Sequence, residues 1–246
     1  RISVNPAGKW NNGSAPNIAF ELWEVYLVGC EIYNTYMDNH LSLVNVQTPA
    51  TGVRSIRVHH NTFDLLSRAG GHGYGIELSV NDAEIDNNWF NGGSYGIANW
   101  SPAYVTNWSI HHNTFNNLSN GYPGEIVRSQ QTGIHNVKIY NNTVEFSGTT
   151  TMNFVGLHKG QSTNIDIKNN LVINSNTSYN WWPNQLIFTE GGASISGLAV
   201  SNNFLSNLAI GYTAGSIVNN FTGDPKIAKS GARPNPYFVP VAGSPL

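Results

Sequence analysis

The stretch Asn107-Trp-Ser-Ile-His-His-Asn-Thr-Phe115 decides the fold, because versions of it recur along most of the chain. The next copy, Asn136-Val-Lys-Ile-Tyr-Asn-Asn-Thr-Val144, keeps the same order of apolar, polar and asparagine positions. Further copies occupy residues 55–63, 82–90, 164–172, 197–205 and 216–222, and a degenerate copy with Thr35 in the asparagine position occupies 30–37. Such repetition indicates an architecture in which each copy stacks on the next.

One asparagine occupies the same place in every full copy, namely Asn61, Asn88, Asn113, Asn142, Asn170, Asn203 and Asn220. Their spacings of 27, 25, 29, 28, 33 and 17 residues are typical of turns of a solenoid. Apolar and polar residues alternate within each copy, which predicts a β-strand rather than a helix. Because a buried amide needs partners, we expect a ladder in which each asparagine side chain hydrogen-bonds to the next.

These patterns predict an all-β fold, a single-domain right-handed parallel β-helix over residues 1–246 with about eight coils. Leucine-rich repeats have a similar period, but their leucine pattern is absent. Residues 1–27 are expected to cap the open edge of the first coil. Residues 223–246, which lack the repeat and are rich in proline, are expected to form a C-terminal cap or tail.

The composition excludes several classes of protein. Charged residues make up only 11% of the 246 residues and the net charge is −2, which argues against nucleic acid or a membrane as partner. No apolar run approaches the roughly 20 residues of a membrane-spanning helix, and a single cysteine excludes a disulfide scaffold. Low charge with abundant asparagine, serine, threonine and glycine predicts a secreted protein, and we expect a monomer. The chain begins at Arg1 without a signal peptide, as expected of a mature or trimmed protein.

The outward positions of the asparagine strands form two polar columns. One column reads Arg57, Glu84, Ser109, Lys138 and Asp166, and the other reads His59, Asp86, His111, Tyr140, Lys168 and Ser201. The first column alternates partly in sign, which favours a structural role for solvated neighbours. In the second column two histidines flank an aspartate, which is compatible with a metal or a sugar and also with a plain polar surface.

A second strand recurs between the asparagine copies, and the scarce charges gather where these strands end. They are Glu77, Glu125, Arg128, His158, Lys159 and Glu190. Counting back from the ladder asparagines places Asn99, Arg128 and Lys159 on three successive coils, within roughly 10 Å of one another. Tyr122 lies in the turn-prone loop Gly121-Tyr-Pro-Gly124 that precedes Arg128. Nearby aromatic residues are Tyr74, Tyr95, Trp100, Tyr104, Trp181 and Trp182. A groove with cations, amides and aromatic rings suits an extended, anionic sugar chain.

These residue types match the requirements of β-elimination on a uronate. Arg128 and Asn99 are expected to bind the carboxylate and stabilise its developing charge, with His158 as a further substrate-binding residue. Lys159 is expected to remove the C5 proton as base, because neighbouring cations lower the pKa of a lysine. Tyr122 is expected to protonate the departing O4 as acid.

Two other functions remain open at this point. Glycoside hydrolysis needs two carboxylates about 5–9.5 Å apart, for which Glu77, Glu125 and Glu190 are candidates. The clustered aspartates of the pectin-hydrolase β-helices have no counterpart as an Asp-Asp pair in this chain. A non-catalytic, carbohydrate-binding solenoid would use the aromatic residues without a base.

The coil pattern over residues 28–222 resembles the right-handed parallel β-helix polysaccharide lyases. Asn120-Gly-Tyr-Pro-Gly-Glu-Ile-Val-Arg128 and Gly156-Leu-His-Lys-Gly160 are similar to the compact alginate lyases of polysaccharide lyase family thirty-one. The resemblance implies an acidic polysaccharide such as alginate as partner, Tyr122 as acid, Lys159 as base, and no metal or other cofactor. Larger β-helix alginate lyases use calcium held by acidic residues, and Glu77 and Glu190 keep calcium open as an alternative.

Overall fold

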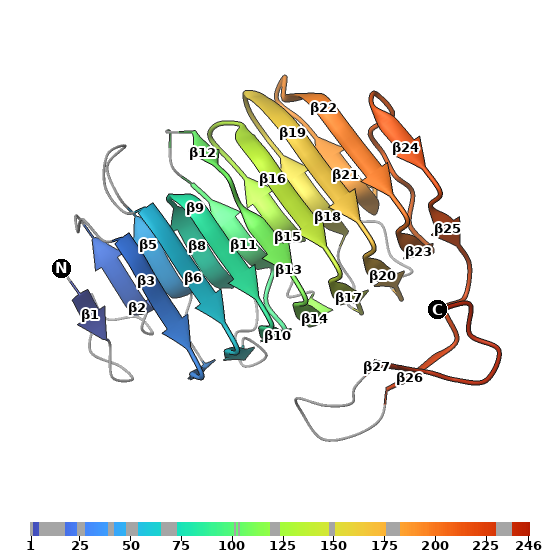
Figure 1. Ribbon diagram of the computed structural model, residues 1–246, viewed down its shortest axis with the longest axis horizontal. Helices are drawn as coiled ribbons and strands as arrows, with labels where there is room; N and C mark the ends of the chain where they lie inside the picture. The colour runs from blue at the N-terminus through green and yellow to red at the C-terminus, as the bar shows by residue number, and fades with distance from the viewer. Residues whose placement is uncertain are drawn as a thin grey trace.

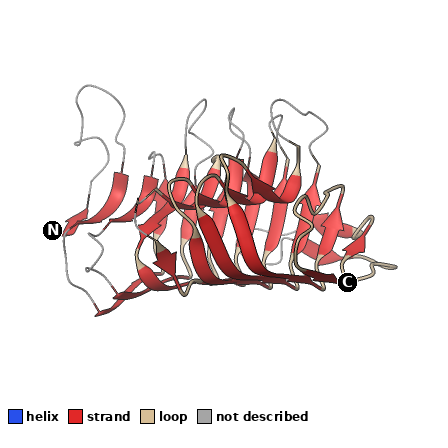
Figure 2. Ribbon diagram, turned by 90° about the horizontal axis from the view of Figure 1, so that it is seen from above, coloured by secondary structure: helices blue, strands red, loops and turns tan. Residues whose placement is uncertain are grey.

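The structure, a computed structural model, describes residues 2–4, 18–23, 28–38, 42–47, 54–64, 73–100, 102, 104–118, 124–147, 151–175, 183–229 and 238–246. Every regular element within these ranges is a β-strand (Figure 2). The described part of the chain holds no helix of the length and apolarity needed to cross a membrane. The predicted all-β class is therefore confirmed.

Three parallel sheets, named A, B and C below, run side by side along the molecule (Figure 1). Sheet A contains β1 (Ile2–Val4), β2 (Ile18–Trp23), β5 (Ser42–Gln47), β8 (Tyr74–Ser79), β11 (Tyr95–Asn99), β15 (Gly124–Ser129), β18 (Met152–Leu157) and β21 (Gln185–Thr189). Sheet B contains β3 (Val28–Tyr33), β6 (Arg54–His59), β9 (Asn81–Asp86), β13 (Ser109–His111), β16 (Ile134–Tyr140), β19 (Gln161–Lys168), β22 (Ser194–Ser201) and β24 (Ser216–Val218), with the short β12 (Val105–Thr106) also paired to β16. Sheet C contains β4 (Tyr36–Asp38), β7 (Thr62–Asp64), β10 (Trp89–Asn91), β14 (Thr114–Leu118), β17 (Thr143–Phe146), β20 (Leu171–Asn174), β23 (Phe204–Ser206) and β25 (Phe221–Thr222).

The chain passes through sheets B, C and A in turn, as in β16, β17 and β18, and each pass stacks on the previous one. This winding is the predicted parallel β-solenoid. Among the described residues, six passes contribute a strand to all three sheets, whereas β22–β23 and β24–β25 contribute only to B and C. There are thus fewer complete coils than the eight or so expected. After β23 the chain still reaches sheet A, through a bridge between Gln185 and Ala209 and backbone hydrogen bonds from Leu186 and Ile187, but it forms no strand there.

The predicted asparagine ladder is present at the turn between sheets B and C. The Asn142 amide donates to Asn170 Oδ1 at 3.0 Å and to the Ile110 carbonyl at 3.0 Å. Asn142 Oδ1 accepts in turn from the backbone and side chain of Asn113, at 3.0 and 3.1 Å. The same contacts link Asn61, Asn88, Asn113, Asn142, Asn170, Asn203 and Asn220. Thr35 ends the row by donating its hydroxyl to Asn61 Oδ1 at 2.7 Å, as its place in the degenerate copy predicts.

The residue before each ladder asparagine, and before Thr35, has a left-handed backbone conformation. These residues are Asn34, His60, Asn87, His112, Asn141, Asn169, Asn202 and Asn219, with φ between 52° and 56°. Asparagine and histidine tolerate this region better than most residues. The requirement explains the second asparagine of the repeat, and it explains why histidine alone replaces it in two turns.

The interior of the solenoid is filled by rows of apolar side chains stacked at the coil spacing. Phe63, Phe90 and Phe115 are fully buried on successive turns, with ring centroids 4.8 and 4.4 Å apart. Toward the N-terminal end, β1 pairs antiparallel with β2 and both extend sheet A. Near the C-terminus, β26 (Ile227–Lys229) and β27 (Phe238–Pro240) form a separate antiparallel pair below the stack in Figure 1.

Candidate functional site

The outer face of sheet A gathers charges because of an irregularity in its strands. In a regular strand, residues i and i+3 point to opposite faces. On β15, however, Ile126 and Val127 both belong to the hydrophobic core. The flanking Glu125 and Arg128 therefore both lie on the outer face, where Arg128 Nη1 contacts Glu125 Oε2 at 2.6 Å.

Glu125 is the centre of a hydrogen-bonded network in which it is completely buried. Its second oxygen lies 2.7 Å from His158 Nε2, and the other nitrogen of His158 contacts Glu190. Arg128 also donates to the side chain of Gln130. The network thus joins side chains from three successive coils. Glu190, its last member, is 38% exposed.

Both nitrogens of His158 face carboxylate oxygens, so this ring joins acidic side chains from the coils on either side of it. Arg128 supplies a cation to the buried Glu125 carboxylate, which a charge at this depth needs.

Aromatic rings enclose the cation of the network. The guanidinium carbon of Arg128 lies 4.7 Å from the Tyr95 ring centroid and 5.1 Å from that of Trp100, and Tyr74 stacks on Tyr95 at 4.9 Å. Burial, reinforced by Tyr95, raises the pKa of the Tyr74 phenol, so this hydroxyl stays protonated at neutral pH. Arg128 Nε and Trp100 Nε1 are buried donors without an acceptor among the described residues. Both N–H groups are buried beside aromatic surface, and the aromatic rings are of the kind that binds sugars.

Gly156 makes room for the network on β18. A Cβ at this position would lie 1.9 Å from Glu125 Oε1, so no other residue fits without displacing that carboxylate. Glycine is therefore required here for close approach and not for backbone conformation.

The structure brings together only part of the predicted site. Arg128 and His158 share the network, and Lys159 follows His158 with its side chain exposed. Tyr122 lies outside the described residues. The strand register pairs Arg128 with Ala98, while Asn99 pairs with Ser129.

Asn99, Arg128 and Lys159 lie on three successive coils as predicted, but the count that set Asn99 beside Arg128 is out of register by one residue. Asn99 is buried, and its Oδ1 accepts a hydrogen bond from the Ser79 hydroxyl at 3.5 Å. The approximate count along loops of different length is the cause of the error.

Sequence reasoning named the charges but not their pairing, and it missed Gln130 entirely. The signal for the pairing is the order Glu-Ile-Val-Arg, in which two apolar residues separate opposite charges. The pairing also argues against Glu125 as a residue of glycoside hydrolysis. Arg128 and His158 enclose its carboxylate, and neither oxygen is exposed to solvent to reach a glycosidic bond.

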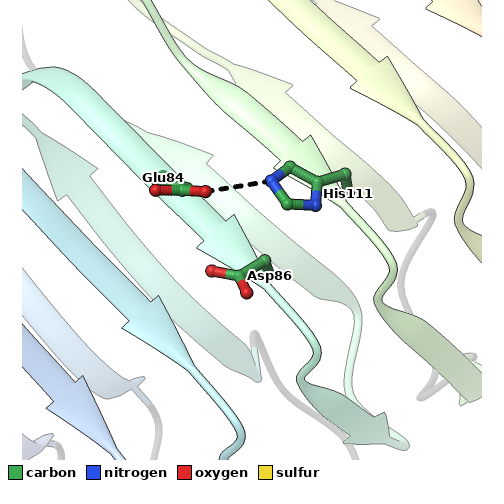
Figure 3. Close-up of side chains that lie close together, drawn as sticks. All are labelled: Glu84, Asp86 and His111. Carbon is green, nitrogen blue, oxygen red and sulfur yellow. Dashed lines mark hydrogen bonds and ion pairs between the residues drawn. The ribbon is translucent and has the colours of Figure 1, made fainter.

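The outer face of sheet B carries the predicted columns in register. Ser109 and His111 of β13 pair with Glu84 and Asp86 of β9, and Figure 3 shows Glu84 directed at the His111 ring. Asp86 is held by Arg57 through two hydrogen bonds of 2.8 and 2.9 Å. Burial alone would raise the pKa of Asp86, but the hydrogen bonds from Arg57 and Asn87 outweigh it and hold the pKa below its usual value.

No family model matches the chain, and comparisons with curated proteins and with solved structures also found no match. The parallel β-solenoid and its asparagine ladder are therefore established from the structure of this chain and not from relatives. The resemblance to polysaccharide lyase family thirty-one remains a prediction carried by the residues of sheet A.

Proposed function

We propose that the chain is a secreted polysaccharide lyase that cleaves alginate or a similar polyuronate by β-elimination, in the manner of the compact alginate lyases of polysaccharide lyase family thirty-one. The observation that carries the proposal is the outer face of sheet A, where the Arg128 guanidinium lies against the rings of Tyr95 and Trp100. Aromatic faces bind sugar rings, and a guanidinium binds carboxylates through its planar array of donors. The β-solenoid supplies a rigid face along which an extended chain can lie.

The proposed steps assign one task to each residue. Arg128 stabilises the negative charge that develops on the uronate carboxylate as the C5 proton leaves. The amine of Lys159 takes that proton, the C5–H electron pair forms the C4–C5 double bond, and the C4–O4 bond breaks. Tyr122 gives its phenolic proton to O4. His158, which contacts both Glu125 and Glu190, is the further substrate-binding residue of the network.

The first experiment incubates the protein with alginate, pectate and hyaluronate and follows the ultraviolet absorbance of unsaturated uronate ends. We expect absorbance to grow with alginate or another polyuronate. New reducing ends without absorbance would indicate hydrolysis, and binding without either product would indicate a carbohydrate-binding solenoid. Either result would contradict the proposed lyase.

Variants then test the two proton-transfer residues. Lys159→Ala and Tyr122→Phe should each lower turnover by about 10²-fold or more, because positioned acids and bases contribute that much. Matched controls are Lys168→Ala and Tyr33→Phe, which change half-exposed or exposed residues of sheet B. Equal effects in variants and controls would overturn the assignment of roles.

A chelator tests the calcium alternative. The proposed mechanism uses no metal, so activity should survive treatment with a chelator followed by desalting. Lasting inactivation that added calcium reverses would transfer the charge-stabilising role from Arg128 to a metal.

A further inference from the structure

Two turns of the solenoid carry consecutive histidines whose rings meet. His111 Nδ1 and His112 Nδ1 lie 2.8 Å apart, and so do the same atoms of His59 and His60. Adjacent residues of a strand normally project to opposite faces, but the left-handed backbone of His60 and His112 turns both rings to one side. The turn that the ladder imposes thus creates a pair of neighbouring imidazole nitrogens.

The contacts around His111 and His112 define where their protons lie. His111 Nε2 lies 3.2 Å from Glu84 Oε1 and donates to it, which leaves a lone pair on His111 Nδ1. His112 Nδ1 donates to that lone pair, and its Nε2 accepts from the Asn141 amide at 3.3 Å. One proton on each ring gives all four nitrogens a partner, and an imidazole with one proton can coordinate a metal through its other nitrogen.

Glu84 and Tyr140 hold His111 in this state. The Glu84 contact directs one nitrogen of the ring toward the carboxylate and the other away from it (Figure 3). Tyr140 stacks on the same ring with a centroid distance of 4.7 Å. A carboxylate on the far nitrogen of a histidine orients the ring and raises its basicity as a ligand.

The distance between the two nitrogens selects the geometry of the metal. With metal–nitrogen bonds of about 2.05 Å, a separation of 2.8 Å gives an angle of about 86° at the metal. That angle fits square-planar or octahedral coordination, whereas a tetrahedral ion needs about 109°. Among divalent ions that favour imidazole and right angles, Cu²⁺ binds most strongly.

We propose that His111 and His112 form a bidentate Nδ1,Nδ1 site for Cu²⁺ or a similar tetragonal divalent ion, with water completing the coordination. Binding moves the Nδ1 proton of His112 to Nε2 of the same ring, and the exposed Asn141 amide rotates to accept it. No proton leaves the protein, and the Glu84 contact is kept.

The acidic cluster beside the pair is a poorer metal site. One ligand atom each from Glu84, Asp86 and His111 lie within 4.8 Å of one another. However, Arg57 occupies both oxygens of the buried Asp86, so a cation there would displace or face a guanidinium. The proposed metal site therefore lies at His111 Nδ1, the ring nitrogen that faces away from Glu84.

His59 and His60 form the natural comparison. Their Nδ1 atoms have the same separation, but the buried His59 Nε2 has no hydrogen-bond partner among the described residues. Without a carboxylate to hold one tautomer, this pair should bind the ion more weakly, by about tenfold or more.

The test titrates the full chain with Cu²⁺ by calorimetry and records electron paramagnetic resonance at substoichiometric copper. The spectrum should be tetragonal with two imidazole nitrogens. His112→Asn should abolish the tightest site, and asparagine suits the position because Asn87, Asn141 and Asn169 occupy it in other turns. Glu84→Ala should weaken the site about tenfold or more while both histidines remain. His60→Asn should leave it unchanged.

Circular dichroism and melting temperature establish that each variant folds. Retention of the tightest site in folded His112→Asn would overturn the proposal. Loss of that site in His60→Asn alone, or a spectrum with fewer than two imidazole nitrogens, would also overturn it.

Discussion

The outer faces of sheets A and B arise from the same winding and carry charged side chains in very different surroundings. On sheet A, Glu125 is completely buried and each of its oxygens has a cationic or histidine partner. On sheet B, the Glu84 side chain is 45% exposed and contacts Arg57 and His111. Complete pairing thus accompanies burial at Glu125, and also at Asp86 on sheet B, whereas the exposed Glu84 makes looser contacts.

The comparison also distinguishes two ways in which side chains come together to form a site. The charges of sheet A come from residues that do not repeat, so their meeting depends on one particular register of β11, β15 and β18. The histidine pairs of sheet B come from the repeat itself, because the turn before each ladder asparagine has the same backbone. A unique site and a recurring site therefore coexist on one solenoid.

The largest effect is expected from Glu125→Ala. The variant leaves Arg128 and His158 buried without their carboxylate, which should lower the free energy of unfolding by about 3–5 kcal/mol. Glu84→Ala on sheet B should change it by only about 0.5 kcal/mol. Urea unfolding followed by circular dichroism measures both, and similar losses in the two variants would contradict the contrast between the faces.

Arg128→Lys should rank next. Lysine keeps the charge but lacks the planar array of donors, so polyuronate cleavage should fall about 10²–10³-fold, which is about 2.7–4 kcal/mol of transition-state stabilisation. Lys168→Arg, a reverse exchange on sheet B, should leave cleavage unchanged. The ratio kcat/KM of the two variants checks this, and undiminished cleavage in Arg128→Lys would remove Arg128 from the mechanism.

Gly156→Ala tests packing on sheet A without changing a charge. The added methyl would collide with Glu125, so we expect a loss of about 1–3 kcal/mol in the free energy of unfolding. Ser109→Ala, a change of similar size on the outer face of sheet B, should cost about 0.5 kcal/mol or less. A neutral Gly156→Ala would mean that the Glu125 carboxylate is free to move.

The smallest effect concerns pH and the sheet B ladder. Because the pKa of Asp86 is lower in the folded protein than in the unfolded chain, its contribution to stability is present above about pH 4 and is lost as the pH falls through the folded value. Asp86→Asn should therefore lose less stability than the wild type on acidification, by about 1 kcal/mol or less. If the wild type and Asp86→Asn lost the same amount of stability on acidification, the proposed stabilisation by the Arg57–Asp86 pair would be refuted.

Much of the fold could be predicted, because the repeat specifies local structure and stacking at once. The repeat pattern identifies every ladder asparagine, and Thr35 in the degenerate copy hydrogen-bonds to Asn61 as predicted. The site was predicted less well. Arg128 and His158 do share a network, but Asn99 was placed one residue out of register because loops between the sheets differ in length.

The amino-acid sequence by itself determined the winding of this protein, since the buried asparagine at each turn is satisfied by the equivalent residues above and below it and by backbone carbonyls. Only the tertiary structure decided which charges meet. Two consecutive inward residues turned Glu125 and Arg128 to the same face, and a left-handed backbone turned His111 and His112 together. Both are departures from regular strand alternation, and such departures depend on how a coil fits its neighbours.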